Sequence, residues 1–569
     1  LIALIGFYRR LRNQEQEKKT MVHAVMRYTL RLLTSDQADR IVRLMGAMNY
    51  VQEVEIKEGE FPRFRLGMWV GSAVSPNDLL KNPNRGYGKV SAEESLDRLM
   101  TGSSETEGTI LQFEVCPWCG DDSDNGIKSP ECWSIDEFNG KPSLIGICPN
   151  EDCLFSKEKG GREGIPFTAI DDDIYLNPPT VLLATADKFA RLSFNPWAKS
   201  IDHKEDSNTA KQHNCRTLFA FDGVLRPPDL IIQDELHLLT GPLGTTAGLI
   251  ESTMDVLWSA HGHKPKYVAA TATIRGADKD VHLMYGRELN VFPPPVAEAT
   301  DNFFAREDKE KPGRVHTSIL GPPNKARTVL NQPMASLLQR VGELKQAFPN
   351  MSNKLVDPFH TLVAYFNSLR ELGGAQASLP GRIAAELIPR FANESGFISR
   401  ELKERKELTS RRTSSELKEV KSALKRSIEQ DHCVDTVVTT NMFQVGIDIP
   451  RLGLMAIVGQ PKSNSEYIQS SGRVGRRKPG LVVSLLRSTF PRDQSHFENF
   501  RAFHQELYRH VDMTSTTPFS QRSLDRGAVT VLTILLRMGI PELTQRKNLG
   551  KIVESQAIRN ASENLRDNF

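Results

Sequence analysis

The stretch that decides the fold is residues 228–240, which read Pro-Asp-Leu-Ile-Ile-Gln-Asp-Glu-Leu-His-Leu-Leu-Thr. The apolar run at 230–232 lies between prolines and a Gly-Pro turn, a pattern that predicts a buried strand of a parallel sheet. Asp234, Glu235 and His237 follow it, and an open α/β sheet binds its ligands beyond the carboxyl ends of its strands. One of two adjacent carboxylates can hold the metal of a magnesium nucleotide, while the other orients and deprotonates the attacking water. Such a tetrapeptide is a weak signal alone, so the rest of the chain must supply the other parts of the site.

Length and composition bound the class of protein. A chain of 569 residues is too long for one core, and roughly three or four domains of about 150 residues are expected. The 73 basic and 70 acidic residues leave a net charge of +3, so the global charge does not indicate a nucleic-acid partner. No apolar run approaches the roughly 20 residues that span a bilayer, and no secretory signal pattern opens the sequence. We therefore expect a cytoplasmic protein without a membrane partner.

Four of the seven cysteines form two close pairs, Cys116 with Cys119 and Cys148 with Cys153. This spacing predicts a tetrahedral zinc site of the ribbon type, and four thiolates would leave no open position for catalysis, so the zinc is expected to be structural. The first pair alone could be a redox dithiol, but the second pair and the missing thioredoxin-like context argue against that reading. Cys132 is either a spare thiol or a replacement ligand.

Composition also divides the chain into segments. Strand and helix patterns occupy residues 1–51 and 171–290, and they return in a second α/β block at 331–490. Between the first two segments, residues 52–170 are rich in Gly, Pro, Asn and Asp and are expected to form an insertion. Residues 291–330 are rich in Pro, Lys and Asp and are expected to be a linker. The final segment, 491–569, is expected to be a helical region that is incomplete.

Polar residues stand at the ends of several expected strands. Thr271 and Thr273 follow a strand at 267–270, where their hydroxyl groups can bond His237 and relay the state of the nucleotide. Arg27 follows a strand that starts at residue 23, where an arginine is placed to touch a phosphate backbone. A solvated loop is the alternative for that arginine.

Residues 466–477 read Glu-Tyr-Ile-Gln-Ser-Ser-Gly-Arg-Val-Gly-Arg-Arg. We expect Arg473 and Arg476, three residues apart on a helix, to point at one anionic site. Guanidinium groups bind phosphate oxygens bidentately and do not lose their charge. An arginine that reaches a γ-phosphate bound to another domain is an arginine finger.

Together these segments resemble the motifs of superfamily 2 helicases of the DExH-box type. Residues 234–237 look like motif II, 271–273 like motif III, 446–450 like motif V and 469–476 like motif VI, the most specific of the set. Residues 27–34 and 233–237 are similar to the helicase subunits of the bacterial DISARM anti-phage systems. The resemblance implies an α/β fold with two RecA-like parallel-sheet lobes. The first lobe would be formed by 1–51 and 171–290, with a zinc-ribbon-like insertion at 52–170, and the second by 331–490.

The resemblance also implies roles for individual residues. Asp234 would hold Mg²⁺, Glu235 would be the general base, and His237 would couple hydrolysis to movement together with Thr271 and Thr273. The residues expected to contact ATP from the second lobe are Gly446, Asp448, Gln469, Arg473 and Arg476. Those expected along a groove for the nucleic-acid backbone are Arg27, Thr185, Asn367 and Thr440. The implied cofactors are ATP, Mg²⁺ and structural Zn²⁺, and the implied partner is a nucleic acid, with DNA favoured.

One motif of the family is missing from the sequence. The GxxxxGK[ST] loop, whose backbone amides and lysine hold the β- and γ-phosphates, does not occur in these 569 residues. Residues 1–13 look like the helix that follows this loop. We therefore expect the loop to precede Leu1 and this chain alone to hydrolyse ATP poorly.

The leading hypothesis is an ATP-dependent nucleic-acid helicase or translocase that acts in anti-phage defence with other subunits of the defence system. The alternative is a non-catalytic nucleic-acid-binding scaffold with a degenerate helicase fold. A zinc-dependent nuclease or deaminase is excluded, because no His-x-Glu precedes the cysteine pairs and four thiolates close the metal shell.

Overall fold

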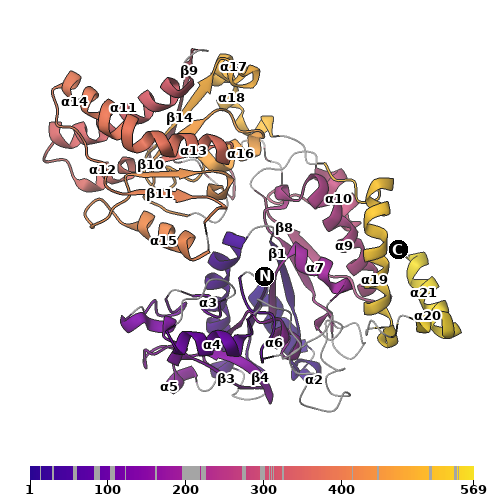
Figure 1. Ribbon diagram of the computed structural model, residues 1–569. Coiled ribbons are helices and arrows are strands. Elements are labelled where there is room, and N and C mark those ends of the chain that lie inside the picture. Colours follow the sequence, from indigo (N-terminus) through magenta and orange to yellow (C-terminus); the bar gives the residue numbers. More distant parts are fainter. Residues whose placement is uncertain are drawn as a thin grey trace. The chain divides into compact units, whose positions relative to one another are not determined.

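The computed structural model describes the chain in two compact units (Figure 1). Unit 1 comprises Leu1–Leu289 and Thr514–Phe569, and unit 2 comprises Asn290–Met513, so the chain leaves unit 1 and later returns to it. The residues described are 1–569 except 13, 29–30, 56–60, 73, 82–89, 103–108, 114, 122, 161–162, 195–217, 220–225, 272–276, 295, 297–300, 305, 307, 309, 312, 323–325, 413, 445–447, 512–514, 544–547, 549 and 569. Within them, no helix is long and apolar enough to cross a membrane.

Unit 1 is built on a six-stranded sheet with the order β5-β2-β6-β1-β7-β8. Its strands are β1 (Ala24–Tyr28), β2 (Leu66–Trp69), β5 (Phe167–Thr168), β6 (Val181–Thr185), β7 (Leu230–Gln233) and β8 (Lys266–Ala269). All neighbouring strands are parallel, so their carboxyl ends lie at one edge. Every residue of β6 is buried, as expected for a central parallel strand covered on both faces.

Most helices of unit 1 pack around this sheet, while the last two pack on α19. These helices are α1 (Ile2–Arg12), α2 (Gln14–Glu17), α3 (Arg31–Glu55), α6 (Asp171–Leu176), α7 (Ala186–Ala190), α9 (Gly241–Ala260), α10 (Ala277–Tyr285), α19 (Gln521–Gly539), α20 (Lys551–Glu554) and α21 (Gln556–Asn568). Helix α9 opens with a proline in its first turn, where a missing N–H costs nothing.

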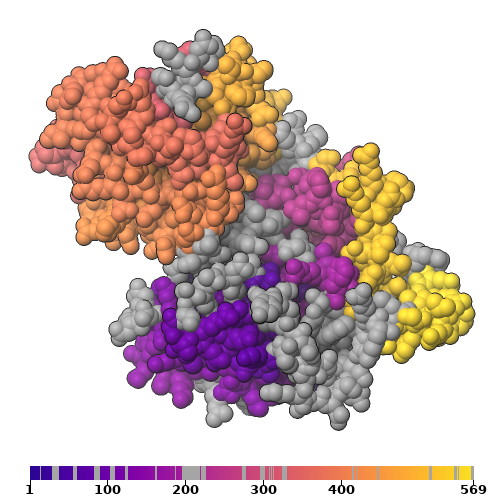
Figure 2. All heavy atoms as spheres, in the orientation of Figure 1, coloured from indigo at the N-terminus to yellow at the C-terminus, as the bar shows by residue number. Residues whose placement is uncertain are grey.

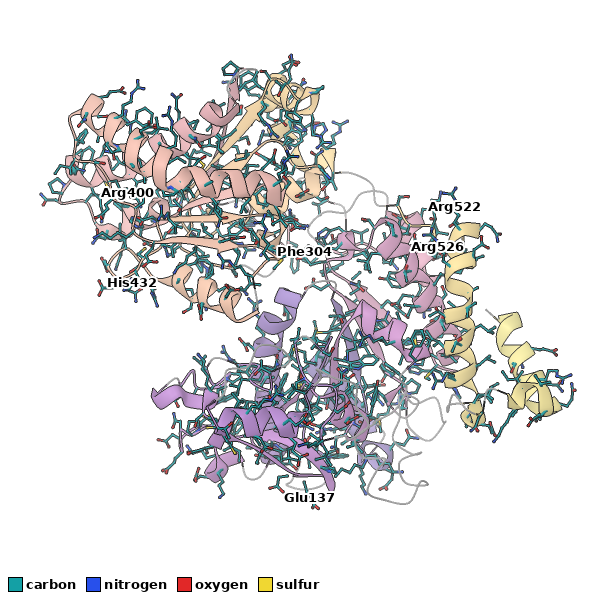
Figure 3. All side chains as sticks on the ribbon, viewed as in Figure 1. Glu137, Phe304, Arg400, His432, Arg522 and Arg526 are labelled. Atoms are coloured by element: carbon teal, nitrogen blue, oxygen red, sulfur yellow. The ribbon has the colours of Figure 1, made fainter. Side chains whose placement is uncertain are left out.

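The C-terminal helices, yellow in Figures 1 and 2, belong to unit 1. Ile534 and Met538 of α19 are fully buried and share one apolar cluster with Met254 of α9. The exposed side of α19 carries Arg522 and Arg526 (Figure 3). This amphipathic pattern explains why a helix from the end of the chain returns to the first sheet.

The insertion in unit 1 holds a two-stranded antiparallel hairpin, β3 (Trp133–Phe138) and β4 (Lys141–Gly146). Its turn residues, Asn139 and Gly140, both have positive φ, as a two-residue turn that matches the strand twist requires. Two helices flank the hairpin, α4 (Ala92–Met100) and α5 (Lys157–Gly160). The buried Arg65 ties the hairpin to the sheet, because its Nη2 donates to Ser143 Oγ at 2.7 Å and lies 3.0 Å from Asp173 Oδ2.

Unit 2 contains a second six-stranded parallel sheet with the order β11-β12-β10-β13-β14-β9. Its strands are β9 (Arg314–Gly321), β10 (Leu362–Phe366), β11 (Arg405–Leu408), β12 (Thr436–Thr439), β13 (Leu454–Val458) and β14 (Gly480–Arg487). Its helices are α11 (Ala326–Ala347), α12 (Asn353–His360), α13 (Leu369–Ser378), α14 (Ile388–Ser395), α15 (Ser414–Lys425), α16 (Asn464–Ser471), α17 (Pro491–Glu498) and α18 (Phe500–Gln505), with a π-helical turn at Leu379–Leu387.

The predicted fold class, two parallel-sheet lobes with a cysteine-bearing insertion, is confirmed. The segment bounds differ from the expected ones in several places. Strands β2 and β5 lie within 52–170 and join the main sheet, β9 lies within the expected linker, and 491–569 is divided between the two units. Residues 400–426 contain β11 before α15 begins. Charged residues at a sheet edge can form a strand, because one side of that strand faces water.

Candidate active site

The two carboxylates lie at the carboxyl edge of the first sheet, directly after β7. Asp234 Oδ1 accepts a hydrogen bond from the backbone N–H of Glu235 at 2.9 Å, and Gln233 Nε2 donates to the Asp234 carbonyl at 2.9 Å. Glu235 has a φ of +50°, a left-handed conformation that is uncommon outside glycine. Backbone strain of this kind costs about 1–3 kcal/mol and clusters at functional sites. The Asp234 carboxylate is therefore held by the backbone of the next residue.

His237 links this strand end to the end of the next strand. A short turn, Leu236–Leu238, brings His237 Nδ1 to 3.0 Å from Thr271 Oγ1 and 3.5 Å from Glu235 Oε2. The hydrogen bond expected between His237 and a hydroxyl group after β8 is thus present with Thr271. Thr273, the second hydroxyl expected here, lies outside the described residues.

The other two candidates in unit 1 are buried. Thr185 ends β6 and is 5% exposed. Arg27 is 3% exposed, forms an ion pair with Glu251, and stacks over the ring of Phe189 at 4.7 Å. Burial lowers the pKa of Arg27. The expectation that Arg27 touches a phosphate backbone is not supported, because its guanidinium is enclosed and already paired.

Arg473 and Arg476 lie just after helix α16, and not within it as expected. Gly472 caps the helix, and Gly475, at a φ of +65°, turns the chain away. Arg473 Nε donates to the Gln444 carbonyl at 2.8 Å, and Arg476 Nη1 lies 2.7 Å from Asp448 Oδ1. The two segments that resemble motifs V and VI are therefore in contact.

The remaining candidates of unit 2 also lie at or near strand ends. Gln469 is on α16 and is 8% exposed. Asn367 follows β10, and its Nδ2 lies 3.2–3.3 Å from three carbonyl oxygens that end or follow β13. Thr440 follows β12 and is 6% exposed. Gly446 lies outside the described residues.

The four predicted zinc ligands come together in the insertion. The sulfur atoms of Cys116, Cys119, Cys148 and Cys153 lie within 4.8 Å of one another. The Cys116–Cys153 and Cys119–Cys148 distances are 3.6 and 3.7 Å. Tetrahedral ligands with Zn–S bonds near 2.3 Å are about 3.8 Å apart, so the residues fit a zinc ion.

The surroundings of the cluster support a cation. Burial raises the pKa of Cys116 to about 12 and also raises that of Cys153, so the free thiolates would be unfavourable without a compensating positive charge. Cys132 stands apart from the cluster, and its Sγ lies 3.5 Å from the Gly126 carbonyl. The position of Cys132 therefore favours the spare-thiol reading over the replacement ligand.

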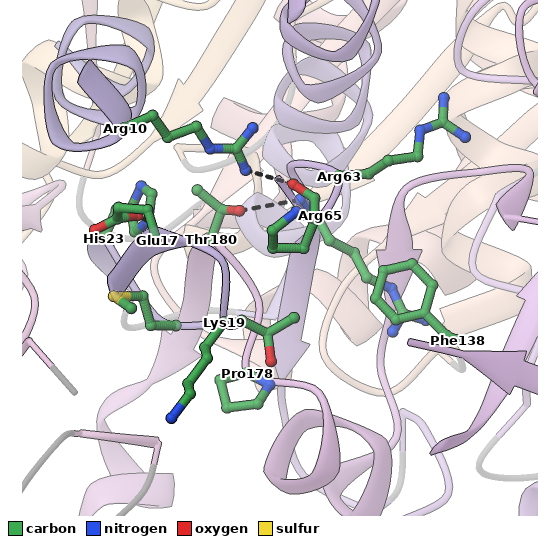
Figure 4. Close-up of a pocket in the computed structure, with 12 residues that line it drawn as sticks. Arg10, Glu17, Lys19, His23, Arg63, Arg65, Phe138, Pro178 and Thr180 are labelled. Atoms are coloured by element: carbon green, nitrogen blue, oxygen red, sulfur yellow. Dashed lines mark hydrogen bonds and ion pairs between the residues drawn. The ribbon is translucent and has the colours of Figure 1, made fainter. Parts of the chain in front are cut away.

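A small polar pocket lies at the other edge of the first sheet (Figure 4). Its lining residues are Arg10, Glu17, Lys19, Thr20, Met21, His23, Pro62, Arg63, Arg65, Phe138, Pro178 and Thr180. His23 precedes β1 and Thr180 precedes β6, so the pocket lies at the amino ends of the strands. Glu17 fills part of it with ion pairs to Arg9 at 2.8 Å and His23 at 2.7 Å. This pocket is therefore separate from the carboxylates of Asp234 and Glu235.

Two residues that sequence reasoning missed are central to unit 2. The Gln444 carbonyl holds Arg473, and the Tyr365 hydroxyl holds the Gln444 side chain at 2.6 Å. Gln444 lies two residues before the stretch that resembles motif V, and nothing in the sequence pairs it with a tyrosine 79 residues earlier.

A match to a protein-family model defines the class of protein. Residues 391–478 match the helicase conserved C-terminal domain, which here spans β11, β12, β13 and α16 and contains Asp448, Gln469, Arg473 and Arg476. With two parallel-sheet lobes, this match confirms the resemblance to superfamily 2 helicases.

Individual proteins are also similar to this chain in sequence or in structure. The chain is 39% identical over 575 residues to the DISARM protein DrmA of Bacillus paralicheniformis, covering 96% of this chain and 49% of that protein. It is 22% identical over 270 residues to the uncharacterized ATP-dependent helicase YprA of Bacillus subtilis, covering 46% of this chain and 30% of that protein. A solved structure of Mycobacterium smegmatis helicase Lhr, bound to ssDNA and AMP-PNP, matches with a TM-score of 0.47 and 14% identity, covering 96% of this chain and 51% of that one. The resemblance to the DISARM family is thus confirmed, and the chain spans about half the length of DrmA.

Proposed function

We propose that the protein is an ATP-dependent nucleic-acid helicase or translocase of anti-phage defence, with DNA as the favoured substrate. The observation that carries the proposal is the division of charge between the units: Asp234 and Glu235 end a strand of the first sheet, and Arg473 and Arg476 belong to the second unit. The identity to a DISARM protein supports the defence role and a partnership with other defence subunits.

In this proposal the carboxylates act on a magnesium nucleotide. Asp234 holds the metal, and Glu235 orients the attacking water and takes its proton. Bound Mg²⁺ supplies neutralising charge for the phosphates. The strained φ of Glu235 and its 3.5 Å distance to His237 support a residue held in a set position for this work.

The second unit supplies the cationic half of the site. Arg473 and Arg476 face the transferring phosphate as arginine fingers, which stabilise negative charge as it develops. Gln469, Gly446 and Asp448 complete the contacts from this unit. Asp448 already pairs with Arg476 at 2.7 Å, which supports a joint role.

Hydrolysis is coupled to movement through His237. Its hydrogen bond to Thr271, at 3.0 Å, joins two strand ends that meet the nucleotide and the nucleic acid, with Thr273 as the second hydroxyl. Thr185, Asn367 and Thr440 lie along the groove that binds the nucleic-acid backbone. The cysteine cluster binds a structural zinc that stabilises the insertion.

The experiment is Glu235→Gln in the full-length protein. Turnover of ATP should fall roughly 10²-fold or more, because the amide cannot accept the proton of water, while binding of ATP and DNA is kept. Glu288→Gln, an exposed carboxylate outside the site, is the matched control and should turn over ATP at the wild-type rate. Unchanged turnover in Glu235→Gln would remove Glu235 from the role of base. The scaffold alternative predicts that the wild-type protein binds nucleic acid but has no ATP turnover to lose.

A further inference from the structure

Tyr365 is fully buried in β10, yet its hydroxyl group is engaged on both sides. The hydroxyl donates to Glu466 Oε1 at 2.6 Å and accepts from Gln444 Nε2 at 2.6 Å. Burial raises the pKa of Tyr365 far above its usual range, so the phenol stays protonated and keeps both bonds at any working pH. A buried tyrosine with two short bonds to polar side chains links those side chains in addition to packing in the core.

The side chain points to the opposite face of the sheet from the main apolar cluster of unit 2. Leu362, Ala364 and Phe366 of the same strand belong to that cluster, whereas Tyr365 does not. Alternate residues of a strand face opposite sides. Tyr365 therefore contacts the side on which α16 and the turn after β12 lie, where both of its polar partners are found.

The two partners lie on the segments that frame Arg473. Glu466 is in the first turn of α16, where its N–H is capped by Ser463, and the end of that helix leads to Arg473. Gln444 follows the turn after β12, and its carbonyl oxygen accepts from both Nε and Nη2 of Arg473. Tyr365 thus fixes both the helix before Arg473 and the carbonyl that holds its guanidinium.

We propose that Tyr365 is a positioning residue for Arg473, acting through the side chain and carbonyl of Gln444. This inference rests on the proposed function, in which Arg473 faces the nucleotide phosphates. Without the phenol hydroxyl, the Gln444 side chain loses its buried acceptor and its backbone carbonyl is no longer fixed. The Arg473 guanidinium then adopts several positions, and only a fraction of them stabilises the transition state.

The test is Tyr365→Phe in the full-length protein, which keeps the ring and removes the hydroxyl. Turnover of ATP should fall about ten-fold with KM for ATP unchanged, because the lost contact matters in the transition state. In Arg473→Ala, turnover of ATP should fall about 10³-fold. Adding Tyr365→Phe to Arg473→Ala should cause no further loss, because the tyrosine acts only through that arginine.

Tyr467→Phe is the matched control. Tyr467 is also fully buried, and its hydroxyl lies 3.1 Å from His316 Nδ1 and 2.8 Å from His504 Nε2. It lies on α16 but has no bond to Gln444 among those described. Its loss should lower the melting temperature as much as Tyr365→Phe while leaving turnover near the wild-type value. If Tyr365→Phe does not fold, Gln444→Met cuts the same link with a side chain of similar shape.

The outcomes separate the proposed role of Arg473 from the proposed role of Tyr365. Wild-type turnover in Arg473→Ala would overturn the proposed role of Arg473 and this inference with it. If ATP turnover is low in Arg473→Ala but near the wild-type value in Tyr365→Phe, the positioning role alone is overturned. The same holds if the two losses of turnover multiply in the double variant. An equal loss of turnover in Tyr467→Phe would assign the effect to general stability and would also overturn it.

Discussion

The carboxyl edges of the two parallel sheets place their charged groups by different means. In the first sheet, Asp234 and Glu235 are neighbours in sequence, and they are held by nearby residues, Asp234 by Gln233 and the Glu235 N–H and Glu235 by His237. In the second sheet, Arg473 is held by a carbonyl 29 residues away, and Arg476 by Asp448. Short carboxylate side chains move with their own backbone, whereas a long arginine needs a distant partner to select one position.

This difference teaches how the charged groups at each sheet edge tolerate change. The first edge depends on local backbone geometry, so a substitution elsewhere in unit 1 leaves the carboxylates in place unless the sheet itself unfolds. The second edge depends on contacts between segments, so changes far from Arg473 can still displace it. Perturbations confined to one unit can test this contrast.

The largest expected effect is loss of the cysteine cluster, which perturbs unit 1 alone. Cys148→Ser should remove the zinc and destabilise the insertion on the order of 4 kcal/mol, because the metal–thiolate bonds that cross-link the two cysteine pairs are lost. Zinc content per chain and hydrogen exchange of peptides from each unit measure this. Exchange in β10 and β13 should not change.

Cys132→Ser is the control, since that thiol lies outside the cluster. It should keep the zinc and the stability of the wild type. A Cys148→Ser protein with full zinc content would rule out Cys148 as a ligand.

An intermediate effect is expected from acid, and it should be stronger in unit 2. Burial lowers the pKa of His316 to about 4 and also lowers those of His360, His496 and His504. Such histidines bind fewer protons when folded, so the stability they give is complete above about pH 6.5 and is lost as the pH falls toward 4.

In unit 1, groups with a lowered pKa and groups with a raised pKa occur together. Its described residues include one such histidine, His23, together with Glu163 and Asp171, whose pKa burial raises. Carboxyl groups with raised pKa take up protons in the folded state and so favour folding as the pH falls.

On moving from pH 7 to pH 5, unit 2 should therefore lose on the order of 1 kcal/mol more than unit 1. Hydrogen exchange of each sheet at the two pH values gives the comparison. His316→Gln should flatten the pH dependence of unit 2, and the exposed His432→Gln should leave it unchanged. Equal losses in the two units would contradict the expected contrast.

The smallest effect is expected at the link between strand ends in unit 1. Thr271→Val removes the hydroxyl that bonds His237 at 3.0 Å and keeps the shape of the side chain. Stimulation of ATP turnover by DNA should fall about five-fold, and basal turnover should change less. A five-fold change corresponds to about 1 kcal/mol, which is what one hydrogen bond contributes. Thr246→Val, on the exposed side of α9, should have no effect. A basal rate that falls as much as the stimulated rate would place Thr271 in hydrolysis and not in coupling.

The sequence predicted strands that carry a run of apolar residues and missed several that do not. Strand β7 matches the expected apolar run at 230–232, because a parallel strand covered on both faces is continuously apolar. Strand β9 alternates between partly and fully exposed residues, and β11 reads Arg-Lys-Glu-Leu, so neither has that signal.

The candidate site shows the same division. The tetrapeptide at 234–237 and the cysteine pairs were readable because their members lie close together in the chain. Arg27 was misread, because its acidic partner Glu251 comes from a helix more than 200 residues later. Tyr365 was not foreseen, because its partners are 79 and 101 residues away and only the folded sheet brings them together.

The return of α19 to unit 1 has a consequence for the order of events on the ribosome. Unit 2 is one continuous segment and can fold as soon as it has emerged, whereas the core of unit 1 lacks Ile534 and Met538 until the segment after unit 2 has been made. Domains generally fold in the order of synthesis, the N-terminal one first. Here unit 1 starts before unit 2 and is completed after it, so during translation the apolar face of α9 stays uncovered until α19 has been made.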